Sequence, residues 1–405
     1  MKSTMEETIS SVITESEDTK RKIKILMISE NFSYIGGVEG TLSLLATYLN
    51  KERFELHFCV LRGTGGSCAK SIESCGYSIT PLHLSDLYDP RYIFKIFKIF
   101  RLINQIQPDI IHTWDVDGNL LGRIPAILTR APLIISHEVL RWDLRLNLIE
   151  KISNCFVKVS NMFLDPFTDI TICNSKNVRL FRDKTGDDAK FRTCFQPLET
   201  AKFLELGKER TDHFNSNEHP KLGIVARLDH QKGHKYLLEA MPKVLVSYPS
   251  SKLYIVGIGR EEKRLKELTK QLKIEASVKF VGELSHELPK FLASLDLFIH
   301  PSIYEGGGPR AVLEAMATGV PVIATAIAEI RETITHGKNG ILVPPSNSSA
   351  LSEAIIELLS NPSKAKRIGL EAHNFLKQDR FDTKVYIDEI ESIYEELACH
   401  KLPSR

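Results

Sequence analysis

The sequence predicts an α/β fold with two doubly wound Rossmann-like domains that face each other across a cleft. The chain has 405 residues, more than one core usually supports, so two domains of roughly 150–200 residues are expected. Short continuous apolar runs alternate with helical segments, as in parallel sheets that are buried on both faces. This alternation occurs twice, with a polar stretch between the two series.

The first series begins at IKILMIS (23–29), which precedes a glycine turn and the helical stretch TLSLLATYLN. The other strand candidates of this series are ELHFCVL (55–61), DIIHTW (109–114), PLIISH (132–137) and DITICN (169–174). We therefore expect a first domain over 21–200. Residues 1–20 are polar and acid-rich, without an apolar signal region, and predict a flexible tail.

The second series follows a polar stretch, and 201–220 is predicted to be a linker. Its strand candidates are KLGIVAR (221–227), KLYIVGIG (252–259), VKFVG (278–282), LDLFIH (295–300) and VPVIAT (320–325). We expect a second domain over 221–375, and a C-terminal helix in 376–405 that packs back on the first domain. Ligands of such sheets bind at the carboxyl ends of the strands, which places the site in the cleft between the domains.

Composition excludes several classes of protein. Hydrophobic residues make up 42% and charged residues 26%, which is ordinary for a globular protein, and the net charge of +2 gives no reason to expect nucleic-acid binding. The seven scattered cysteines contain no CxxC pair and suit free thiols in a reducing cytoplasm. No apolar run approaches the ~20 residues of a membrane-spanning helix. We expect a cytoplasmic protein.

The stretch HPSIYEGGGPRAVLEAMATGVPVIAT (300–325) places two glutamates around a glycine loop and a helix start. The loop glycines are Gly306, Gly307 and Gly308. Glycines at a helix N-terminus let backbone N–H groups approach an anion, so a phosphate suits this place. Glu305 and Glu314 would repel a phosphate, and sugar hydroxyls are their natural partners: a hexose for the first, a ribose diol for the second. The alternative is a solvated acid and a helical ion pair.

Two further segments are candidates for diphosphate binding. GIVARLDHQKGHKYLLEAM (223–241) places Arg227 at the end of a strand and Lys232 before a glycine and a helix. A guanidinium and an ammonium on one loop suit a diphosphate, although two surface cations are the alternative. The third segment, Gly36-Gly37 at a helix start, is weak alone because it lacks the GxGxxG pattern.

Taken together, these segments resemble the retaining glycosyltransferases of family four, which have the GT-B architecture. The likeness extends from about residue 22 to 395. It rests on GGVE (36–39), the loop with Arg227, Lys232 and Gly233, the VKFVG strand, the PSIYEG…LEAMATGVPVIAT block and HGKNGILVPP (336–345).

The resemblance implies transfer of a hexose from a nucleoside-diphosphate sugar to a hydroxyl of a glycan, glycolipid or small molecule, with retention at the anomeric carbon and without metal or cofactor. It implies that Glu305 contacts the transferred sugar and Glu314 the nucleotide ribose. It places His137, at the end of a first-domain strand, beside the sugar and acceptor. The diphosphate is assigned to Arg227, Lys232 and the backbone of Gly36 and Gly37. The predicted catalytic residues are His137, Glu305, Arg227 and Lys232.

Three departures from the family pattern concern the site. Eight residues separate Glu305 from Glu314, one more than is usual, and AIAE (326–329) replaces the usual D-x-G-G. QPLETAKF (196–203) stands where Asn-Gly often enters the linker. Two alternative functions therefore stay open: a nucleotide-sugar epimerase or hydrolase on the same fold, and an inactive nucleotide-sugar-binding protein.

Other candidates have structural interpretations beside functional ones. Asp115-x-Asp117 matches a metal-binding pair by chance as easily as by function, and we expect no metal site. His112 is expected to be a packing residue, and a structural role is the alternative for His137. The segment 91–107, RYIFKIFKIFRLINQIQ, is either a helix packed on its sheet with a solvated stripe of Lys95, Lys98 and Arg101, or a helix that contacts the inner-membrane surface and makes the protein peripheral there.

Overall fold

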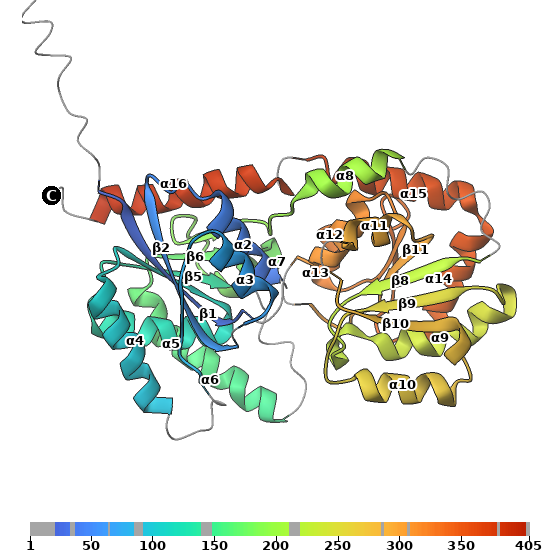
Figure 1. The fold of residues 1–405 in the computed structure, drawn as a ribbon, viewed down its shortest axis with the longest axis horizontal. Helices are drawn as coiled ribbons and strands as arrows, with labels where there is room; N and C mark the ends of the chain where they lie inside the picture. The colour runs from blue at the N-terminus through green and yellow to red at the C-terminus, as the bar shows by residue number, and fades with distance from the viewer. Residues whose placement is uncertain are drawn as a thin grey trace, which may run out of the picture.

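The computed structural model describes residues 21–32, 37–63, 65–84, 92–138, 148–209, 219–284, 287–305, 308–378 and 381–401. Two α/β domains lie side by side, each built on one sheet of parallel strands (Figure 1). The predicted fold class of two doubly wound Rossmann-like domains is confirmed. The predicted tail, 1–20, lies outside the described residues.

The N-terminal domain contains a seven-stranded sheet in the order β3-β2-β1-β4-β5-β6-β7. Its strands are β1 Ile23–Asn31, β2 Phe54–Gly63, β3 Ile79–Pro81, β4 Ile110–Trp114, β5 Leu133–Glu138, β6 Ile170–Cys173 and β7 Phe191–Thr193. Its helices are α2 Gly37–Tyr48, α3 Ser67–Ser74, α4 Tyr92–Ile106, α5 Asp115–Leu128, α6 Leu148–Leu164, the 3₁₀ helix η2 Asp165–Phe167 and α7 Lys176–Arg182. Alternate residues of β1 enter different cores: Ile25 and Met27 pack with α2 and α3, and Leu26 and Ile28 pack with α4 and α5. Apolar residues on both faces explain the unbroken apolar run of this strand.

The C-terminal domain contains a six-stranded sheet in the order β10-β9-β8-β11-β12-β13. Its strands are β8 Lys221–Val225, β9 Lys252–Val256, β10 Val278–Gly282, β11 Leu297–His300, β12 Val322–Thr325 and β13 Ile341–Val343. Its helices are α8 Thr200–Glu209, η4 His230–Lys232, α9 His234–Ser247, α10 Glu262–Gln271, η5 Glu275–Ser277, α11 Leu288–Ala293, α12 Arg310–Ala317, α13 Ala328–Arg331, α14 Ser348–Ser360 and α15 Pro362–Phe375. The loops after β8 and β11, neighbours in the sheet, carry most of the candidate site residues.

The chain crosses between the domains twice, and the two crossings are hydrogen-bonded to each other. The Leu198 N–H donates to the Phe381 carbonyl (3.1 Å), and the Thr383 hydroxyl donates to the Leu198 carbonyl (3.0 Å). After the second crossing, α16 (Thr383–Lys401) runs along the N-terminal domain (Figure 1). Its apolar side chains, among them Ile390 and Tyr394, share the core of β1 and α2.

The structure differs from the expected linker over 201–220 in its first half, because α8 occupies Thr200–Glu209. Phe203 is buried in the same cluster as residues of α11 and α12, so this polar helix belongs to the C-terminal domain. The three-residue edge strands β3, β7 and β13 were not among the expected strands. Runs this short carry too few apolar residues to stand out in a sequence.

All seven cysteines are free, as expected. Among the described helices, none is long and apolar enough to cross a membrane.

Candidate functional site

Two loops of the C-terminal domain are joined directly to each other beside the sheet. The loop after β8 accepts a hydrogen bond at the Gln231 carbonyl from the N–H of Ile303, on the loop after β11 (2.8 Å). Gly233 has a left-handed backbone, with φ of 68°, and a Cβ at this position would lie 2.0 Å from the Pro301 carbonyl oxygen. Only glycine permits this approach, so the Lys-Gly pair of the sequence fixes Lys232 against the Glu305 loop.

Lys232 and Glu305 form a nearly buried ion pair across these two loops. Lys232 Nζ lies 2.6 Å from both carboxylate oxygens of Glu305. Ser302 Oγ donates to Oε1 (2.7 Å), and His300 Nε2 lies 2.8 Å from the same oxygen. Burial alone would raise the pKa of Glu305, but Lys232 and the His300 hydrogen bond outweigh it and hold the pKa below its usual range. Glu305 is therefore an ionised, rigidly held acceptor.

Arg227 leaves the same loop as Lys232 and remains half-exposed. Its Nη1 lies 3.0 Å from Asp229 Oδ2, and Arg260 Nε lies 3.5 Å from the other oxygen of Asp229. The guanidinium is thus held near the loop by an acid and is still in contact with solvent. The structure thus places Arg227 and Lys232 on one loop, as the sequence indicated.

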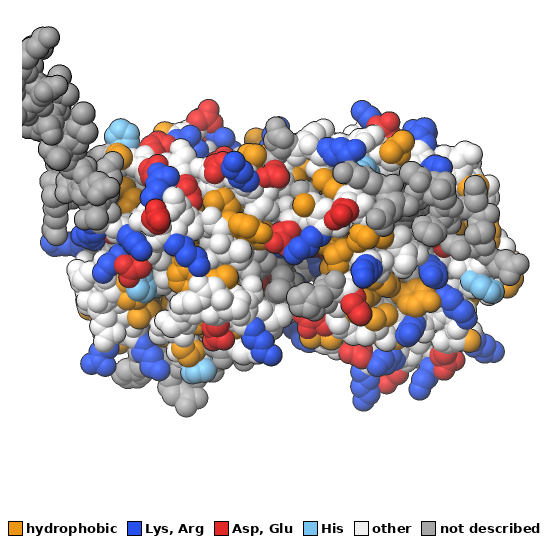
Figure 2. Space-filling model, turned by 45° about the horizontal axis from the view of Figure 1, so that its top comes forward, with side chains coloured by type: hydrophobic (Ala, Val, Ile, Leu, Met, Phe, Trp, Pro, Cys, Tyr) orange, Lys and Arg blue, Asp and Glu red, His pale blue; other side chains and the backbone are white. Residues whose placement is uncertain are grey.

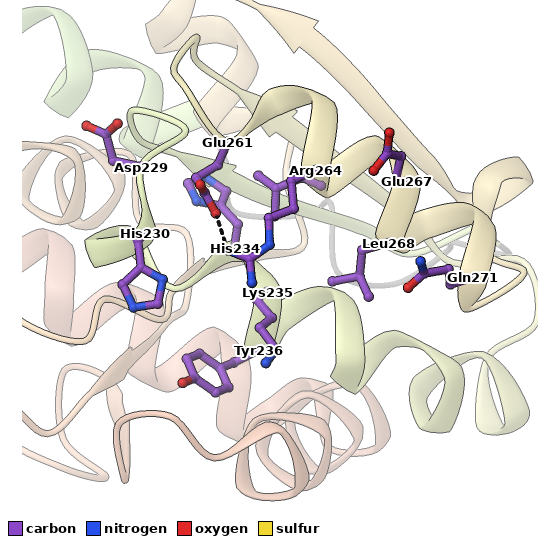
Figure 3. Close-up of a pocket in the computed structure, with 11 residues that line it drawn as sticks. Asp229, His230, His234, Lys235, Tyr236, Glu261, Arg264, Glu267, Leu268 and Gln271 are labelled. Carbon is purple, nitrogen blue, oxygen red and sulfur yellow. Dashed lines mark hydrogen bonds and ion pairs between the residues drawn. The ribbon is translucent and has the colours of Figure 1, made fainter.

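A surface pocket of about 400 Å³ adjoins this loop, between the first turn of α9 and the length of α10 (Figure 3). Asp229, His230 and Lys235 line one part of it, and the Glu261–Arg264 ion pair lines another. Arg227, Lys232 and Glu305 are not among its lining residues. The pocket is therefore a neighbour of the Lys232–Glu305 pair and does not contain it.

Glu314 lies in the middle of α12 and is buried. Arg310, one turn earlier, donates from Nε to Oε1 of Glu314 (2.8 Å). Burial raises the pKa of Glu314, and Arg310 offsets only part of that rise. The helical ion pair named as the alternative for Glu314 is thus present in the structure. It does not contradict a role in ribose binding, since a carboxylate has two oxygens.

The two glycine segments approach each other through Gln196, in the first crossing between the domains. A Cβ on Gly37, at the start of α2, would lie 2.8 Å from Gln196 Nε2. A Cβ on Gly308, before α12, would lie 3.7 Å from Gln196 Oε1. Gln196 is buried, and its side chain lies near both Gly37 of the N-terminal domain and Gly308 of the C-terminal domain. Gly36, Gly306 and Gly307 lie outside the described residues.

His137 lies at the carboxyl end of β5, within the N-terminal domain. Its ring stacks on Trp114, paired with it in the sheet, with centroids 3.9 Å apart. Burial lowers the pKa of His137 to about 3, so the imidazole is neutral near pH 7. Among the described residues, no contact joins it to Glu305 or Lys232. His112 is buried with Nδ1 2.7 Å from the Tyr394 hydroxyl of α16, which confirms a packing role.

The buried histidines predict a loss of stability in acid. His112, His137 and His234 all have a pKa lowered by burial, the last two to about 3. Unfolded histidine titrates near pH 6.5, so the unfolded chain binds these protons first and stability falls as pH drops from about 6.5 toward 3. The raised pKa values of Glu314 and Asp115 offset part of this loss.

His137→Phe isolates one of these protons, because a phenyl ring retains stacking on Trp114. We expect the slope of unfolding free energy against pH, between about pH 6 and 4, to fall by about 1.4 kcal/mol per pH unit. Urea unfolding at several pH values measures it. An unchanged slope would mean that His137 titrates normally in the folded protein.

Asp115 and Asp117 form hydrogen bonds and an ion pair within the N-terminal domain. Asp115 Oδ2 accepts from the Ser29 hydroxyl and the Glu30 N–H, both at 2.8 Å, and so holds the end of β1. Asp117 pairs with Arg62. Within the described residues, no group of three His, Cys, Asp or Glu side chains has an arrangement that would hold a metal ion.

Three residues at the site were not predicted from the sequence: His300, Ser302 and Gln196. The first two stand in the HPS stretch directly before Glu305, so their nearness in sequence was the available signal. Gln196 lies far from both glycine segments in the sequence, and only the three-dimensional fold shows its position. The structure brings Lys232 together with Glu305, places Gly37 and Gly308 each beside Gln196, and leaves His137 and Glu314 with partners of their own domains.

Comparison with known proteins agrees with this arrangement. The profile of the Glycosyl transferases group 1 family matches residues 207–375, and that of Glycosyltransferase Family 4 matches 35–180. The Methanocaldococcus jannaschii protein named uncharacterized glycosyltransferase MJ1607 is 39% identical over 34% of this chain and 35% of its own length. The Corynebacterium glutamicum GDP-mannose-dependent monoacylated alpha-(1-6)-phosphatidylinositol monomannoside mannosyltransferase is 37% identical over 49% of this chain and 55% of its own. The chain thus matches about a third to a half of the length of these relatives.

A solved structure extends the likeness of fold to almost the whole chain. Anabaena Alr3699/HepE, in complex with UDP-glucose, superposes with a TM-score of 0.73 at 21% identity, over 92% of this chain and all of that one. The Glycosyltransferase Family 4 profile lies within the N-terminal domain of this chain, and the group 1 profile lies within the C-terminal domain, from the last residues of α8 to the end of α15. The chain belongs to the group 1, family 4 glycosyltransferases of the GT-B fold.

Proposed function

We propose that this protein transfers a hexose from a nucleoside-diphosphate sugar to a hydroxyl of a glycan, glycolipid or small molecule, with retention at the anomeric carbon. The observation that carries the proposal is the Lys232–Glu305 ion pair. It joins a cation suited to phosphate with an acid suited to sugar hydroxyls, as the junction between a diphosphate and its sugar requires. One relative is GDP-mannose-dependent and the similar solved structure contains UDP-glucose, so the proposal leaves the base open.

In the proposed reaction, the bond between the anomeric carbon and the diphosphate oxygen breaks, and a bond to the acceptor oxygen forms on the same face. The departing diphosphate takes the acceptor proton. Arg227 and Lys232 stabilise the negative charge that develops on the diphosphate, which is the electrostatic form of catalysis. Glu305 orients the sugar, Glu314 the ribose, and neutral His137 hydrogen-bonds on the acceptor side. The proposal assigns no role to a metal or cofactor.

Backbone groups complete the proposed donor site. The N–H groups at the start of α2, around Gly36 and Gly37, and those around Gly306, Gly307 and Gly308 before α12 would bind phosphate oxygens. Nucleotide sugars and the seven free thiols are both compatible with a cytoplasmic protein, and we propose that location.

Product analysis tests the reaction. The protein is incubated with UDP-, GDP- and ADP-hexoses and a panel of acceptors, and the anomeric coupling of the product is read by NMR. Retention is the expected result. Inversion, or a trapped glycosyl–enzyme adduct, would overturn the same-face mechanism.

The same incubation separates the two alternative functions. Free or isomerised sugar from donor alone would indicate a hydrolase or an epimerase. Donor binding without turnover, with every acceptor, would indicate a nucleotide-sugar-binding protein.

Gln196→Ala is expected to weaken donor binding about tenfold, the order of one lost hydrogen-bonding group. The side chain lies near both Gly37 and Gly308, and its loss lets the two proposed phosphate-binding segments move relative to each other. Calorimetry with the nucleoside diphosphate measures the change, and thermal unfolding shows whether the fold is kept. Equal affinity in the variant would show that Gln196 does not position the donor site.

A further inference from the structure

Helices α4, α5 and α6, with η2, form one outer surface of the N-terminal domain, which we call the α4–α6 surface. α4 contacts α5, α5 contacts α6, and α6 contacts η2. They cover the face of the seven-stranded sheet opposite to α2, α3 and α16 (Figure 1). Inward residues such as Ile99 and Leu121 form the core, and other residues of the same helices, such as Phe97 and Phe163, are exposed.

Each element of this surface exposes at least one large apolar side chain. Six such side chains are exposed: Phe97 on α4, Leu128 on α5, Val159, Met162 and Phe163 on α6, and Phe167 in η2. Phe163 is 64% exposed and Met162 66%. Single exposed apolar residues are normal, but several on adjacent helices are typical of a surface that binds a membrane or another protein.

The fully exposed charges of the α4–α6 surface have one sign wherever their exposure is described. Among the residues whose exposure is described, the exposed charged side chains are Lys98, Arg101, Arg130 and Lys158. Wherever the exposure of this surface is described, no exposed side chain is an aspartate or glutamate. Asp115, Asp117 and Asp165 are only partly exposed, and each is tied to other groups of the domain.

The opposite face of the same sheet has a different character. There, α3 and α16 expose Glu73, Asp388, Glu389 and Glu396 beside lysines. Figure 2 looks toward the side of α16 and shows Lys and Arg interspersed with Asp and Glu. Among the residues whose exposure is described, the α4–α6 surface thus differs from the opposite face in having no exposed acid, in a chain whose net charge is only +2.

We propose that the α4–α6 surface docks on a phospholipid bilayer with anionic headgroups. Aromatic and aliphatic side chains enter the boundary of headgroups and acyl chains, and the flanking cations are attracted by the negative surface potential. A second copy of this surface is disfavoured as the occupant, because two faces of like charge repel each other. The proposed membrane-binding surface contains α4, the helix within 91–107, and extends the expected contact to α5, α6 and η2.

The proposal goes beyond the transfer reaction, and its test uses neither donor nor acceptor. The full chain is sedimented with vesicles of phosphatidylcholine, with and without phosphatidylglycerol, at low and high salt. The variant Lys158→Glu/Phe163→Ser removes one cation and one apolar side chain from the surface. The matched control, Lys384→Glu/Val385→Ser, makes the same changes on α16, where Lys384 is exposed and Val385 is 43% exposed.

We expect binding to anionic vesicles that weakens with salt, falls more than about tenfold in the α6 variant and is unchanged in the control. A second variant, Lys98→Glu/Arg101→Glu on α4, should behave like the first and replaces it if the first variant does not fold.

Failure to bind anionic vesicles at low salt, or an equal loss in the control, would overturn the proposal. So would sedimentation velocity showing a dimer that the α6 variant dissociates. Donor binding retained by the surface variants separates this result from any failure of the proposed function.

Discussion

Lys232→Ala is expected to lower kcat/KM by about a hundredfold to several thousandfold, equivalent to roughly 3–5 kcal/mol of transition-state stabilisation. The proposed donor site assigns this ammonium to the junction of diphosphate and sugar, because it contacts both oxygens of Glu305. Steady-state kinetics with the preferred donor measures the loss. Near-wild-type turnover would discard the assignment of Lys232 to the diphosphate.

Two controls separate catalysis from stability in this variant. Removing Lys232 leaves a buried carboxylate without its cation, which by itself destabilises the fold by about 3–5 kcal/mol. The double variant Lys232→Ala/Glu305→Gln removes that uncompensated charge and should recover part of the lost thermal stability while staying inactive. Lys235→Ala, a neighbouring exposed lysine that pairs with Glu239, should change neither property.

Gly233→Ala should lower the free energy of unfolding by about 3 kcal/mol or more, and should also weaken donor binding. A methyl group there would lie 2.0 Å from the Pro301 carbonyl oxygen, in a backbone conformation that L-residues rarely adopt. The loop that carries Lys232 would have to move away from the loop that carries Glu305. Thermal or urea unfolding gives the first quantity, and calorimetry the second.

Gly337→Ala is the matched control for this substitution. Gly337 has nearly the same backbone, with φ of 75°, but a Cβ there would meet nothing within 4 Å. We expect only the cost of the left-handed conformation, about 1–2 kcal/mol, and unchanged donor binding. If both variants lose the same stability, the contact with Pro301 does not hold the two loops together.

The parts of the fold that were predictable are those in which local pattern and tertiary environment coincide. A strand buried on both faces, such as β1, has to be apolar throughout, and the sequence shows it. Helix α8 is the opposite case: its composition is polar, and its position follows from the burial of Phe203 against the C-terminal domain. The local sequence pattern of α8 does not predict that contact, because its partners lie far away in the sequence.

The candidate site divides in the same way. Lys232 and Glu305 were selected by chemistry and spacing, and their contact required the left-handed Gly233 and the hydrogen bond between the two loops. The position of Gln196 near both Gly37 and Gly308 depends on how the domains are joined, which residue types do not encode locally. The pairing of Glu314 with Arg310, at helical spacing, was visible in the sequence as the alternative interpretation.

The measurement that tests the central claim most directly is the thermal unfolding of the protein with UDP, GDP, ADP and their common sugar conjugates. A ligand at about 100 times its dissociation constant adds about 2.7 kcal/mol of stability. We predict that one nucleoside diphosphate stabilises the protein selectively, and that Arg227→Ala and Lys232→Ala abolish this shift. If no nucleotide shifts the transition and calorimetry agrees, Arg227 and Lys232 are surface cations and the proposed donor site is wrong.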